Sequence, residues 1–299
     1  MIRPLLAFVA AVSLSGCAGL GASHEPRDAL KIASWNLEHL AAANGQGCRP
    51  RTEADYAGLR RHVAALDADV IAFQEVQDRA AAERVFDPAR YTVVMSMRPA
   101  SGRGGACRGR PDLTIQHQAV GFAVRKGLRW RRHADLTALG LGDPDLRWGV
   151  DLTIDHARPI RLLAVHLKSG CPSGRSAEDP DCPILFAQAS ALGDWTDERG
   201  LKDEAFMVLG DWNRRVSQPG DAFLAAVDDG QPAKARLTIA AGDRSATCDP
   251  RYTAFIDHIV AGADAAVRIR PGSFEEYVYG GEAEEAPSDH CPVSVRVSG

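Results

Sequence analysis

The sequence lacks the features that would place it directly in several protein classes. Its 35 Lys and Arg are outnumbered by 39 Asp and Glu, giving a formal net charge of -4, so no overall basic field attracts a polyanion. It contains no internal repeat, no low-complexity segment, and no C-x-x-C or H-x-x-x-H spacing of the kind that zinc sites use. What is present is an ordinary globular composition over 299 residues, 45% hydrophobic and 25% charged. The weak acidity leaves room for a carboxylate-rich metal site.

The N-terminal segment has no apolar run long enough for a permanent membrane span. Arg3 precedes the apolar stretch LLAFVAAVSL, and LSGC follows, which is the charged, apolar and small-residue layout of a secretory signal. Because the small residues end at Cys17, the segment resembles a bacterial lipoprotein signal, in which this cysteine is lipidated and becomes the first residue. The alternative is an ordinary signal cleaved near Ala18 or Ala22, which would discard Cys17.

We therefore expect residues 1–16 to be a lipoprotein signal peptide, 17–28 a tether, and 29–299 a single domain. The protein would be exported and anchored to the bacterial cell envelope through lipid on Cys17. Ala18 is not the Asp that such proteins commonly use for retention at the inner membrane, so attachment to the outer membrane is expected in a Gram-negative host. The sequence leaves the oligomeric state open, and a monomer is the working expectation.

The cysteine count fits export. Without Cys17 an even number remains, namely Cys48, Cys107, Cys171, Cys182, Cys248 and Cys291. In an oxidising compartment such a set indicates disulfides. Cys171 and Cys182 are close enough in sequence to close a small loop. For the others we expect Cys48–Cys107 and Cys248–Cys291, although nothing in the sequence selects these pairs, and a zinc site is the alternative.

Strand-like and helix-like segments interleave along the rest of the chain. Apolar runs predict strands at 30–37, 69–76, 91–97, 117–125, 128–136, 147–154, 158–167, 205–210, 252–260 and 291–297. Helices are predicted at 52–67, with Thr52 as the N-cap, at 183–199 and near 220–227. Many strands with few helices predict an α+β fold of two packed sheets with helices outside, rather than a plain alternation of strand and helix.

Polar residues capable of chemistry stand at six predicted strand ends. They are Asn36, Glu75, His166, Asp211 with Asn213, Asp257, and Asp289 with His290. Chance explains two or three of these, because strand ends are exposed, but six form a pattern. Carboxylate and amide oxygens suit Mg²⁺, and histidines are then available for acid–base work or charge stabilisation. Since phosphoester hydrolysis needs a metal, a positioned water and such donors, the residues predict a metal-dependent phosphoesterase.

The motifs SWNLE, QEV, AVHLKS, GDWN, FIDHI and SDHCPV, in this order and at these intervals, resemble those of the endonuclease/exonuclease/phosphatase superfamily, also called deoxyribonuclease I-like. The resemblance covers nearly everything from about residue 30 to residue 297. It implies a four-layer αββα sandwich of two mixed β-sheets flanked by helices, which agrees with the strand-rich pattern. It also implies hydrolysis of phosphodiesters with Mg²⁺ or Mn²⁺ as cofactor.

Carried over by position, the resemblance implies a metal site. Glu75 would be the principal ligand, with Asn36 and Asp289 completing or supporting the site. Lys168, two residues after the histidine of AVHLKS, would be a further ligand of the substrate phosphate. Glu38 stands where several relatives carry an acidic residue, and it either supports the metal site or is structural.

The resemblance also implies catalytic roles. Asp211 would orient or deprotonate the attacking water, and Asn213 would hold the phosphate or that water. His290, held in its tautomer by Asp257, would stabilise the phosphorane-like transition state. His166 would be a second phosphate contact or the acid for the leaving group.

Other aromatic residues receive structural interpretations. His258 neighbours Asp257 on a predicted strand and is expected to face the opposite way. Trp35 and Trp212 are expected to pack beside the site rather than to stack on bases. The remaining histidines of the predicted domain have no evident partner and are expected at the surface or in structural roles: His39, His62, His117, His133 and His156.

Family resemblance does not select the substrate, since the superfamily hydrolyses DNA, RNA, inositol phosphates, sphingomyelin and other phosphoesters. The histidine of AVHLKSG is similar to that of the deoxyribonuclease I-like and secreted bacterial nuclease branches, and export argues against cytoplasmic DNA repair. We therefore expect a nuclease with nucleic acid as its substrate. One alternative is a phosphatase or phospholipase C-like hydrolase of inositol phosphates or phospholipids. Another is a non-catalytic binding lipoprotein, which the filled catalytic positions disfavour.

Local charge gives two opposing indications. Two basic clusters could neutralise the phosphates of a polynucleotide, or could simply be solvated. They are Arg98, Arg103, Arg108 and Arg110 in one loop, and Arg125, Lys126, Arg129, Arg131 and Arg132 at a strand turn. The acidic stretch EEYVYGGEAEEAPSD leads into Asp289 and His290. It would repel a long duplex if it overhung the site, and would have no bearing on the substrate if it pointed outward.

Overall fold

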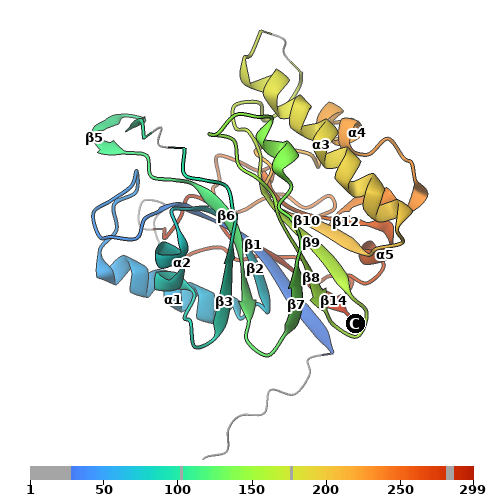
Figure 1. Cartoon of the computed structure of the whole chain (residues 1–299), viewed down its shortest axis with the longest axis horizontal. Helices are drawn as coiled ribbons and strands as arrows, with labels where there is room; N and C mark the ends of the chain where they lie inside the picture. The colour runs from blue at the N-terminus through green and yellow to red at the C-terminus, as the bar shows by residue number, and fades with distance from the viewer. Residues whose placement is uncertain (1–27, 102–103, 176–177, 281–285) are drawn as a thin grey trace, which may run out of the picture.

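Two six-stranded sheets lie face to face in the middle of the molecule, and helices cover their outer faces (Figure 1). The structure, a computed structural model, describes residues 28–101, 104–175, 178–280 and 286–299. The signal peptide expected at 1–16, the lipidation site at Cys17 and all of the tether except residue 28 therefore lie outside the described residues. Among the described residues, no helix combines the length and apolar character that crossing a bilayer requires.

The first sheet has the strand order β13-β14-β1-β2-β6-β3. Its strands are β1 (Ala29–Leu40), β2 (Val70–Val76), β3 (Tyr91–Met95), β6 (Ala119–Arg125), β13 (Glu275–Glu276) and β14 (Val293–Ser298). β1 and β2 are parallel, and the other neighbours are antiparallel. The central strands are buried on both faces, which explains why their sequences read as almost continuous apolar runs.

The second sheet has the order β11-β12-β10-β9-β8-β7. Its strands are β7 (Arg129–Arg132), β8 (Val150–Asp155), β9 (Ile160–His166), β10 (Phe206–Asp211), β11 (Leu237–Ile239) and β12 (Asp257–Gly262). β9 and β10 are parallel and the other neighbours are antiparallel, so this sheet is mixed as well. A separate hairpin pairs β4 (Ala106–Cys107) with β5 (Arg110–Thr114).

Helices α1 (Glu53–Leu66) and α2 (Arg79–Val85) cover the first sheet. Helices α3 (Asp181–Leu201) and α4 (Ala222–Val227) cover the second. The remaining short helical segments are α5 (Ala263–Ala266) and the 3-10 turns Thr137–Gly140 and Ala233–Ala235. α1 begins as predicted, because Thr52 and Asp55 form a reciprocal capping box.

Three apolar clusters account for the layering. One lies between the sheets, one between the first sheet and α1 and α2, and one between the second sheet and α3 and α4. Each fully buried Leu or Val in them contributes roughly 1.5–3 kcal/mol relative to its exposed state. The layers are therefore helix, sheet, sheet and helix, which confirms the predicted four-layer sandwich of two mixed sheets.

Some elements depart from the prediction. The strand expected at 252–260 begins only at Asp257, because the backbone amide of Tyr252 donates to the carbonyl of Asp249 at 2.9 Å and makes a turn there. Helix α2 and the β4–β5 hairpin were not predicted. The hairpin's sequence shows no apolar alternation, and its ladder is short and exposed.

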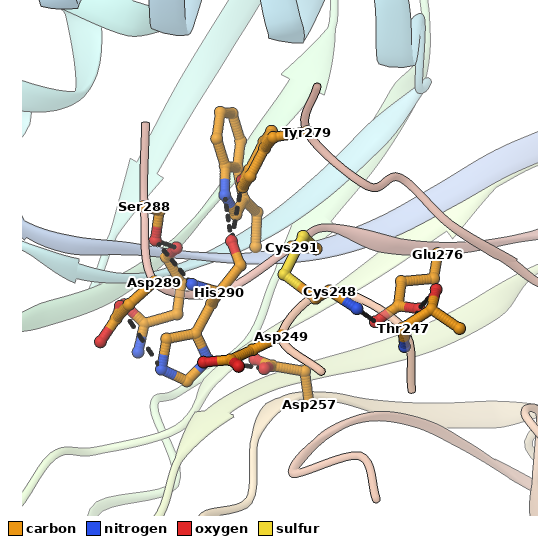
Figure 2. The surroundings of a disulfide bond; sticks show 12 residues. Thr247, Cys248, Asp249, Asp257, Glu276, Tyr279, Ser288, Asp289, His290 and Cys291 are labelled. Atoms are coloured by element: carbon orange, nitrogen blue, oxygen red, sulfur yellow. Dashed lines mark hydrogen bonds and ion pairs between the residues drawn. A yellow bond between two sulfur atoms is a disulfide. The ribbon is translucent and has the colours of Figure 1, made fainter. Parts of the chain in front are cut away.

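Three disulfides cross-link the chain, and they are the three predicted pairs. They are Cys48–Cys107, Cys171–Cys182 and Cys248–Cys291. The first holds the β4–β5 hairpin against the loop after β1. Figure 2 shows the third beside His290, the neighbour of Cys291 in the sequence.

The two ends of the described chain lie together at one end of the sheets. Ala29 pairs with Ser298 across β1 and β14. The C-terminus, which follows β14, is marked in the lower part of Figure 1. Asn36 lies seven residues farther along β1, which corresponds to about 23 Å of extended strand. The residues predicted to be catalytic therefore lie near the opposite end of the sheets from the point where any tether would attach.

Candidate active site

Strand register in the second sheet brings three of the predicted residues side by side. Asp211, the last residue of β10, is paired with His166 on the parallel strand β9. On its other side Asp211 is paired with Asp257, the first residue of β12. Two carboxylates and an imidazole therefore occupy one level of the sheet, at the end where β9 and β10 finish.

Gly210 allows the chain to reach this point. Its φ is +153°, and a Cβ at this position would overlap the carbonyl oxygen of Val165 on β9. Only glycine fits such a close approach of two strands. The glycine of GDWN is thus required by packing, and it sets the position of Asp211 directly after it.

A bulge in the first sheet places the facing residues. Asn36 is paired with Gln74, but the next pair is Leu40 with Val76, so three residues of β1 stand opposite the single residue Glu75. Glu75 has φ +59°, and positive φ values also occur in the extra residues of β1. Non-glycine residues adopt this backbone at a cost, and such strain concentrates at functional sites. The bulge turns the Glu75 carboxylate toward the end of the sheet.

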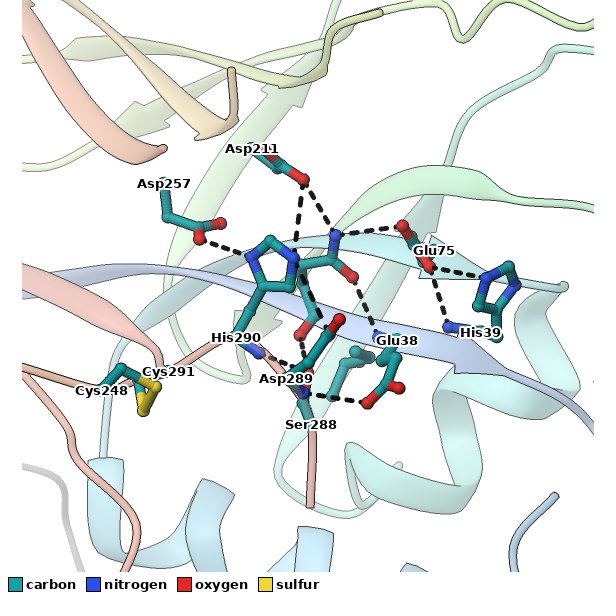
Figure 3. Close-up of polar contacts among 12 residues, drawn as sticks. Glu38, His39, Glu75, Asp211, Cys248, Asp257, Ser288, Asp289, His290 and Cys291 are labelled. Atoms are coloured by element: carbon teal, nitrogen blue, oxygen red, sulfur yellow. Dashed lines mark hydrogen bonds and ion pairs between the residues drawn. A yellow bond between two sulfur atoms is a disulfide. The ribbon is translucent and has the colours of Figure 1, made fainter. Parts of the chain in front are cut away.

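Asn36 links the two sheets. Its side-chain oxygen accepts the backbone amide of Glu38 at 2.9 Å, so its Nδ2 must point the other way. That nitrogen donates to Glu75 at 3.3 Å and to Asp211 at 3.1 Å. Figure 3 shows these two carboxylates together with His290. Asn36 therefore supports the site by holding two carboxylates, and it does not present its oxygen to them.

His290 is fixed on three sides. Its Nδ1 lies 2.6 Å from Oδ2 of Asp257, and its backbone amide donates to Ser288 Oγ at 3.1 Å. Its carbonyl accepts Trp35 Nε1 at 3.2 Å and the Tyr279 hydroxyl at 2.8 Å. The free edge of the ring, Nε2, lies 3.9 Å from Asp211 Oδ2. The carboxylate thus fixes the ring's orientation, as predicted, and the ring faces the centre of the site.

The segment before His290 is clamped to β1. Ser288 Oγ donates to the carbonyl of Asn36 at 2.8 Å, and the backbone amide of Asp289 donates to Glu38 at 2.9 Å. Arg49 in turn lies 2.5 Å from the Glu38 carboxylate. Glu38 is therefore a supporting residue that positions the loop of Asp289.

The protonation states follow from burial and from neighbouring charges. Burial first, and then the Asp257 carboxylate, raise the pKa of Asp211 to about 7. Burial first, and then Arg147, lower the pKa of His166 well below its usual value, so this ring is neutral. At His290 burial acts against the charged form, but Asp257 outweighs it and raises the pKa well above its usual value. His290 is therefore an imidazolium.

The carboxylates fit a hard divalent cation. Asp211, Asp257 and His290 offer ligand atoms within 4.8 Å of one another. Asp257 and His290, however, are already bonded to each other. The oxygens of Glu75, Asp211 and Asp289 remain for a cation, and oxygen donors of this kind suit Mg²⁺ or Mn²⁺. Burial and the neighbouring carboxylates of Asp257 and Glu75 raise the pKa of Asp211 even though His290 lowers it, and a bound cation would offset this concentration of negative charge.

Of the two predicted phosphate contacts Asn213 and Lys168, the structure places only Asn213 at the site. Asn213 lies at the site: its backbone amide donates to Asp211 at 2.8 Å, and its Nδ2 donates to the Leu167 carbonyl at 3.1 Å. Lys168 was predicted to bind the substrate phosphate, but its ammonium pairs with Asp181 at 2.6 Å and donates to the Ser169 carbonyl. Binding a phosphate would require this ion pair to break, so the structure does not present Lys168 as a phosphate ligand.

Sequence reasoning missed two residues of the site. Arg147 donates to the carbonyls of His166 and Leu167 at 3.2 and 2.6 Å, and its charge acts on Glu75. Its position just before β8 gave no signal. His39 was expected at the surface or in a structural role, but its backbone amide donates to Glu75 at 3.0 Å and its ring lies 3.6 Å from the same carboxylate. The bulge that places it cannot be read from the sequence.

The structural interpretations of three aromatic residues are confirmed. His258 is buried and its Nε2 lies 2.8 Å from the Arg214 carbonyl, away from the catalytic residues. Trp35 and Trp212 are fully buried in the two outer cores, so neither is a platform for bases.

The basic clusters are mostly engaged or distant. Arg98 is buried and donates to the carbonyls of Pro144 and Gln118, so it is not available to a phosphate. Arg125 pairs with Asp69 at 2.9 Å. The turn after Arg125 lies where β2 begins, because β6 is antiparallel to β2, whereas Glu75 lies where β2 ends. That cluster is therefore at the wrong end of the sheet for the site.

Only part of each remaining charged loop is described. Arg108 and Arg110 are exposed on the hairpin, and Arg103 lies outside the described residues. In the acidic stretch, Glu275 pairs with Lys31, and Glu276 accepts hydrogen bonds from Thr247 and Cys248. The acidic residues at 282–285 lie outside the described residues.

Comparison with known proteins gives one family and several solved structures. The model of the Endonuclease/Exonuclease/phosphatase family matches residues 33–290. Truncated TDP2 of Caenorhabditis elegans is similar with a TM-score of 0.60 and 15% identity, covering 91% of this chain and 98% of that one. Danio rerio TDP2 complexed with a single-strand DNA product is similar with a TM-score of 0.60 and 17% identity, covering 90% and 98%.

A third similar structure is the 3′-5′ exonuclease NExo of Neisseria meningitidis, with a TM-score of 0.58 and 17% identity, covering 90% of this chain and 100% of that one. No curated protein sequence matches the chain significantly. At these identities the likeness to the solved structures establishes the fold.

Proposed function

The chain belongs to the endonuclease/exonuclease/phosphatase family, and from that premise we propose that it hydrolyses phosphodiester bonds of nucleic acid with Mg²⁺ or Mn²⁺ as cofactor. The observation that carries the proposal is the pair of His290 and Asp257, whose imidazolium faces Asp211 at the strand ends. Asn36 joins the same centre to Glu75. A binding protein has no need for a buried imidazolium aimed at a second buried carboxylate.

A divalent cation would be held by Glu75 and Asp289, with Asp211 beside them. When bound, it supplies a Lewis acid for the phosphoryl oxygen and a site for water. The chain itself prepares the ligands: Asn36 and the backbone amide of His39 both donate to Glu75, at 3.3 and 3.0 Å. Donors of this kind fix the rotamer of a ligating carboxylate.

Asp211 orients the attacking water and accepts its proton. Its Oδ1 is fixed by the backbone amide of Asn213 at 2.8 Å, and its Oδ2 accepts from Asn36 and lies 3.5 Å from His166 Nε2. A pKa of about 7 is suited to proton transfer near neutral pH. Asn213 holds this carboxylate and leaves part of its own amide to contact the phosphate.

His290 and His166 contribute in different protonation states. The His290 imidazolium places positive charge where negative charge develops on the phosphoryl oxygens. His166 is neutral, and its Nε2 lies 3.5 Å from Asp211 and 3.8 Å from Glu75. A ring nitrogen that faces two carboxylates carries the proton, so Nε2–H of His166 can donate to the phosphate or to the leaving oxygen.

Nucleic acid is favoured over a membrane lipid as the substrate. The tether, if lipid-anchored at Cys17, would enter at Ala29, at the end of β1 opposite to Asn36. The catalytic end would then point away from the anchoring membrane. Among structures of similar fold, one TDP2 is complexed with a single-strand DNA product, and NExo is a 3′-5′ exonuclease.

Export and lipid anchoring are part of the same proposal. Three disulfides cross-link the chain, and disulfides persist in oxidising compartments. Together with the signal-like residues 1–16, they support a place in the bacterial cell envelope, at the outer membrane if the host is Gram-negative.

Parallel substrate assays test the function. The full chain, with its disulfides formed, would be incubated with plasmid and single-stranded DNA, and separately with inositol phosphates and sphingomyelin. Each reaction would contain Mg²⁺, Mn²⁺ or EDTA, and His290→Ala would be the control. Metal-dependent DNA cleavage that the variant lacks is the expected result. Intact DNA with release of phosphate or phosphocholine would contradict the nuclease proposal.

A further inference from the structure

A cavity of about 500 Å³ opens directly beside the catalytic residues. Asn213, Asp257 and His290 form its catalytic end. From there it extends past the Cys248–Cys291 disulfide to the turn at 249–252. Its volume lies within the range of pockets that take one small ligand, and a base-paired duplex is too wide to enter a space of this size.

Arg215 lines the cavity two residues after Asn213. Within the described parts of the chain its guanidinium forms no hydrogen bond or ion pair, whereas the adjacent Arg214 is bound by Asp221 at 2.6 Å. A guanidinium of this kind matches the geometry of a phosphate and can bind it through two donors. The cavity thus offers a second phosphate contact, separate from the catalytic residues.

The two acidic residues that line the cavity away from its catalytic end, Asp249 and Glu276, are engaged by neighbouring groups. Asp249 is occupied by Arg251, whose Nη2 lies 2.6 Å from Oδ2. Glu276 accepts hydrogen bonds from the amide and hydroxyl of Thr247 at 2.7 and 2.6 Å. Both carboxylates therefore shape the wall of the cavity. Asp257 and Asp289 carry negative charge at its catalytic end, and Arg215 is the arginine of the wall that is left for a phosphate.

Tyr252 supplies an aromatic surface at the far end. It lines the cavity and is 57% exposed, one of few large apolar side chains with such exposure. Its backbone is held in the turn by the hydrogen bond to Asp249, and the Arg251 guanidinium lies 5.6 Å from its ring centroid. An exposed aromatic ring in the same cavity as an arginine is a combination that proteins use to bind unpaired bases and their phosphates.

We propose that this cavity binds one unpaired nucleotide next to the scissile phosphate, with Arg215 on the neighbouring phosphate and Tyr252 stacked on the base. The proposal rests on the proposed phosphodiesterase function and names its substrate class: nucleic acid that is single-stranded or frayed at the cleavage point. A continuous duplex would have to expose a base before cleavage, at the cost of unstacking it.

Assays with dinucleotides test the phosphate contact of Arg215 and the base contact of Tyr252 separately. The full chain would be assayed with Mg²⁺ on the thymidine dinucleotide TpT, on the same compound with a 5′ or 3′ terminal phosphate, and on analogues with an abasic residue on either side. We expect the wild type to prefer one phosphorylated form over TpT by roughly 10- to 150-fold in kcat/KM. Arg215→Gln should remove this preference by lowering kcat/KM on the phosphorylated form to the value for TpT. Arg129→Ala, on β7 at the other end of the sheet, is the control for charge.

Tyr252→Ala should lower kcat/KM on TpT by roughly 5- to 150-fold and leave one abasic analogue unaffected, while Tyr252→Phe should keep the wild-type rate. Equal loss on both abasic analogues would show a structural role and overturn the proposal. The proposal would also be overturned if Tyr252→Ala hydrolysed TpT at the wild-type rate, or if Arg215→Gln kept the preference for the phosphorylated dinucleotide. Hydrolysis of bis(p-nitrophenyl) phosphate by the wild type tests the proposed function separately, because that compound has neither a base nor a second phosphate.

Discussion

The imidazole of His290 is held 2.6 Å from the Asp257 carboxylate through Nδ1, and it directs Nε2 toward Asp211 at 3.9 Å. The two carboxylates are cross-strand neighbours on β10 and β12. Asp257 therefore keeps the ring charged and oriented, and in the proposed mechanism Asp211 receives the water's proton. Because the His290 ring lies between these two carboxylates, its charge is the feature of the site that mutation can test most directly.

Asp257→Asn should weaken the charge on His290 while keeping a hydrogen-bond partner for Nδ1. Asp257 is the carboxylate that does most to offset burial, so without it the pKa of His290 falls and less of the ring is charged at a given pH. We expect kcat to fall by roughly 100- to 1,000-fold, since a charged donor to the transition state is lost, with little change in KM. Steady-state kinetics on bis(p-nitrophenyl) phosphate measure both. A fall in kcat of less than tenfold, in a variant with an unchanged unfolding temperature, would contradict the role of the imidazolium.

Glu75→Gln should weaken the binding of the divalent cation. The carboxylate loses its charge, while the backbone amide of His39 can still donate to the remaining oxygen. We expect the Mg²⁺ concentration for half-maximal activity to rise at least about tenfold. Glu83→Gln makes the same change of charge on the surface of α2, where its partner is Arg79. An identical Mg²⁺ titration for wild type, Glu75→Gln and the control would remove Glu75 from the metal site.

Strand patterning and cysteine parity could be predicted from the sequence because both depend on local rules. Apolar runs located most strands of both sheets, and polar residues at their ends located His166, Asp211 and Asp257. The sheet register then brings these three together without further information. The disulfide pairs were found as well, although only the short Cys171–Cys182 loop had a sequence argument.

The errors arise where long-range geometry decides. His39 reaches Glu75 only because β1 carries extra residues opposite β2. Arg147 is held at the site by backbone carbonyls at the end of β9. Every residue has such a carbonyl, so the sequence does not indicate which ones accept a hydrogen bond. Lys168 is occupied by Asp181 at the start of α3, a pairing that depends on how that helix packs. Arg98 is likewise buried by the packing of segments that are distant from it in the sequence.

Stability should depend on pH through His117. Burial first, and then Arg98, lower the pKa of this ring to about 4, because an Arg98 nitrogen lies 3.2 Å from its Nδ1. In the unfolded chain the pKa is near its usual value of about 6.5. As pH falls from about 6.5 to about 4 the unfolded state takes up the proton first, so the free energy of unfolding falls in that window and the loss is complete below it.

His117→Gln should reduce this fall. The amide oxygen can still accept from Arg98, but it does not titrate. We expect the difference in unfolding free energy between pH 7.5 and pH 4.5 to be roughly 1 kcal/mol smaller in the variant, since solvent around a half-buried ring screens part of the effect. Urea unfolding of both proteins at the two pH values measures it. Equal pH dependence in both would show that His117 is protonated in the folded state as readily as in the unfolded one.

The Cys248–Cys291 disulfide should matter for catalysis as well as for stability. Cys291 follows His290 directly, and Cys248 belongs to the loop that lines the neighbouring cavity. The Cys48–Cys107 disulfide is a matched control, because the sequence separations are similar, 43 and 59 residues. Loop-closure entropy then predicts that removing either bond costs roughly 4 kcal/mol of stability.

Paired substitutions of both cysteines by serine separate the two effects. We expect both double variants to lose similar stability in urea, but only Cys248→Ser with Cys291→Ser to lower kcat on bis(p-nitrophenyl) phosphate, by roughly tenfold or more, since small displacements of a catalytic group are costly. The assay must be run where both variants remain folded, which circular dichroism establishes. If both double variants lose kcat equally, or neither does, the bond beside His290 has no positioning role beyond the stability that any disulfide supplies.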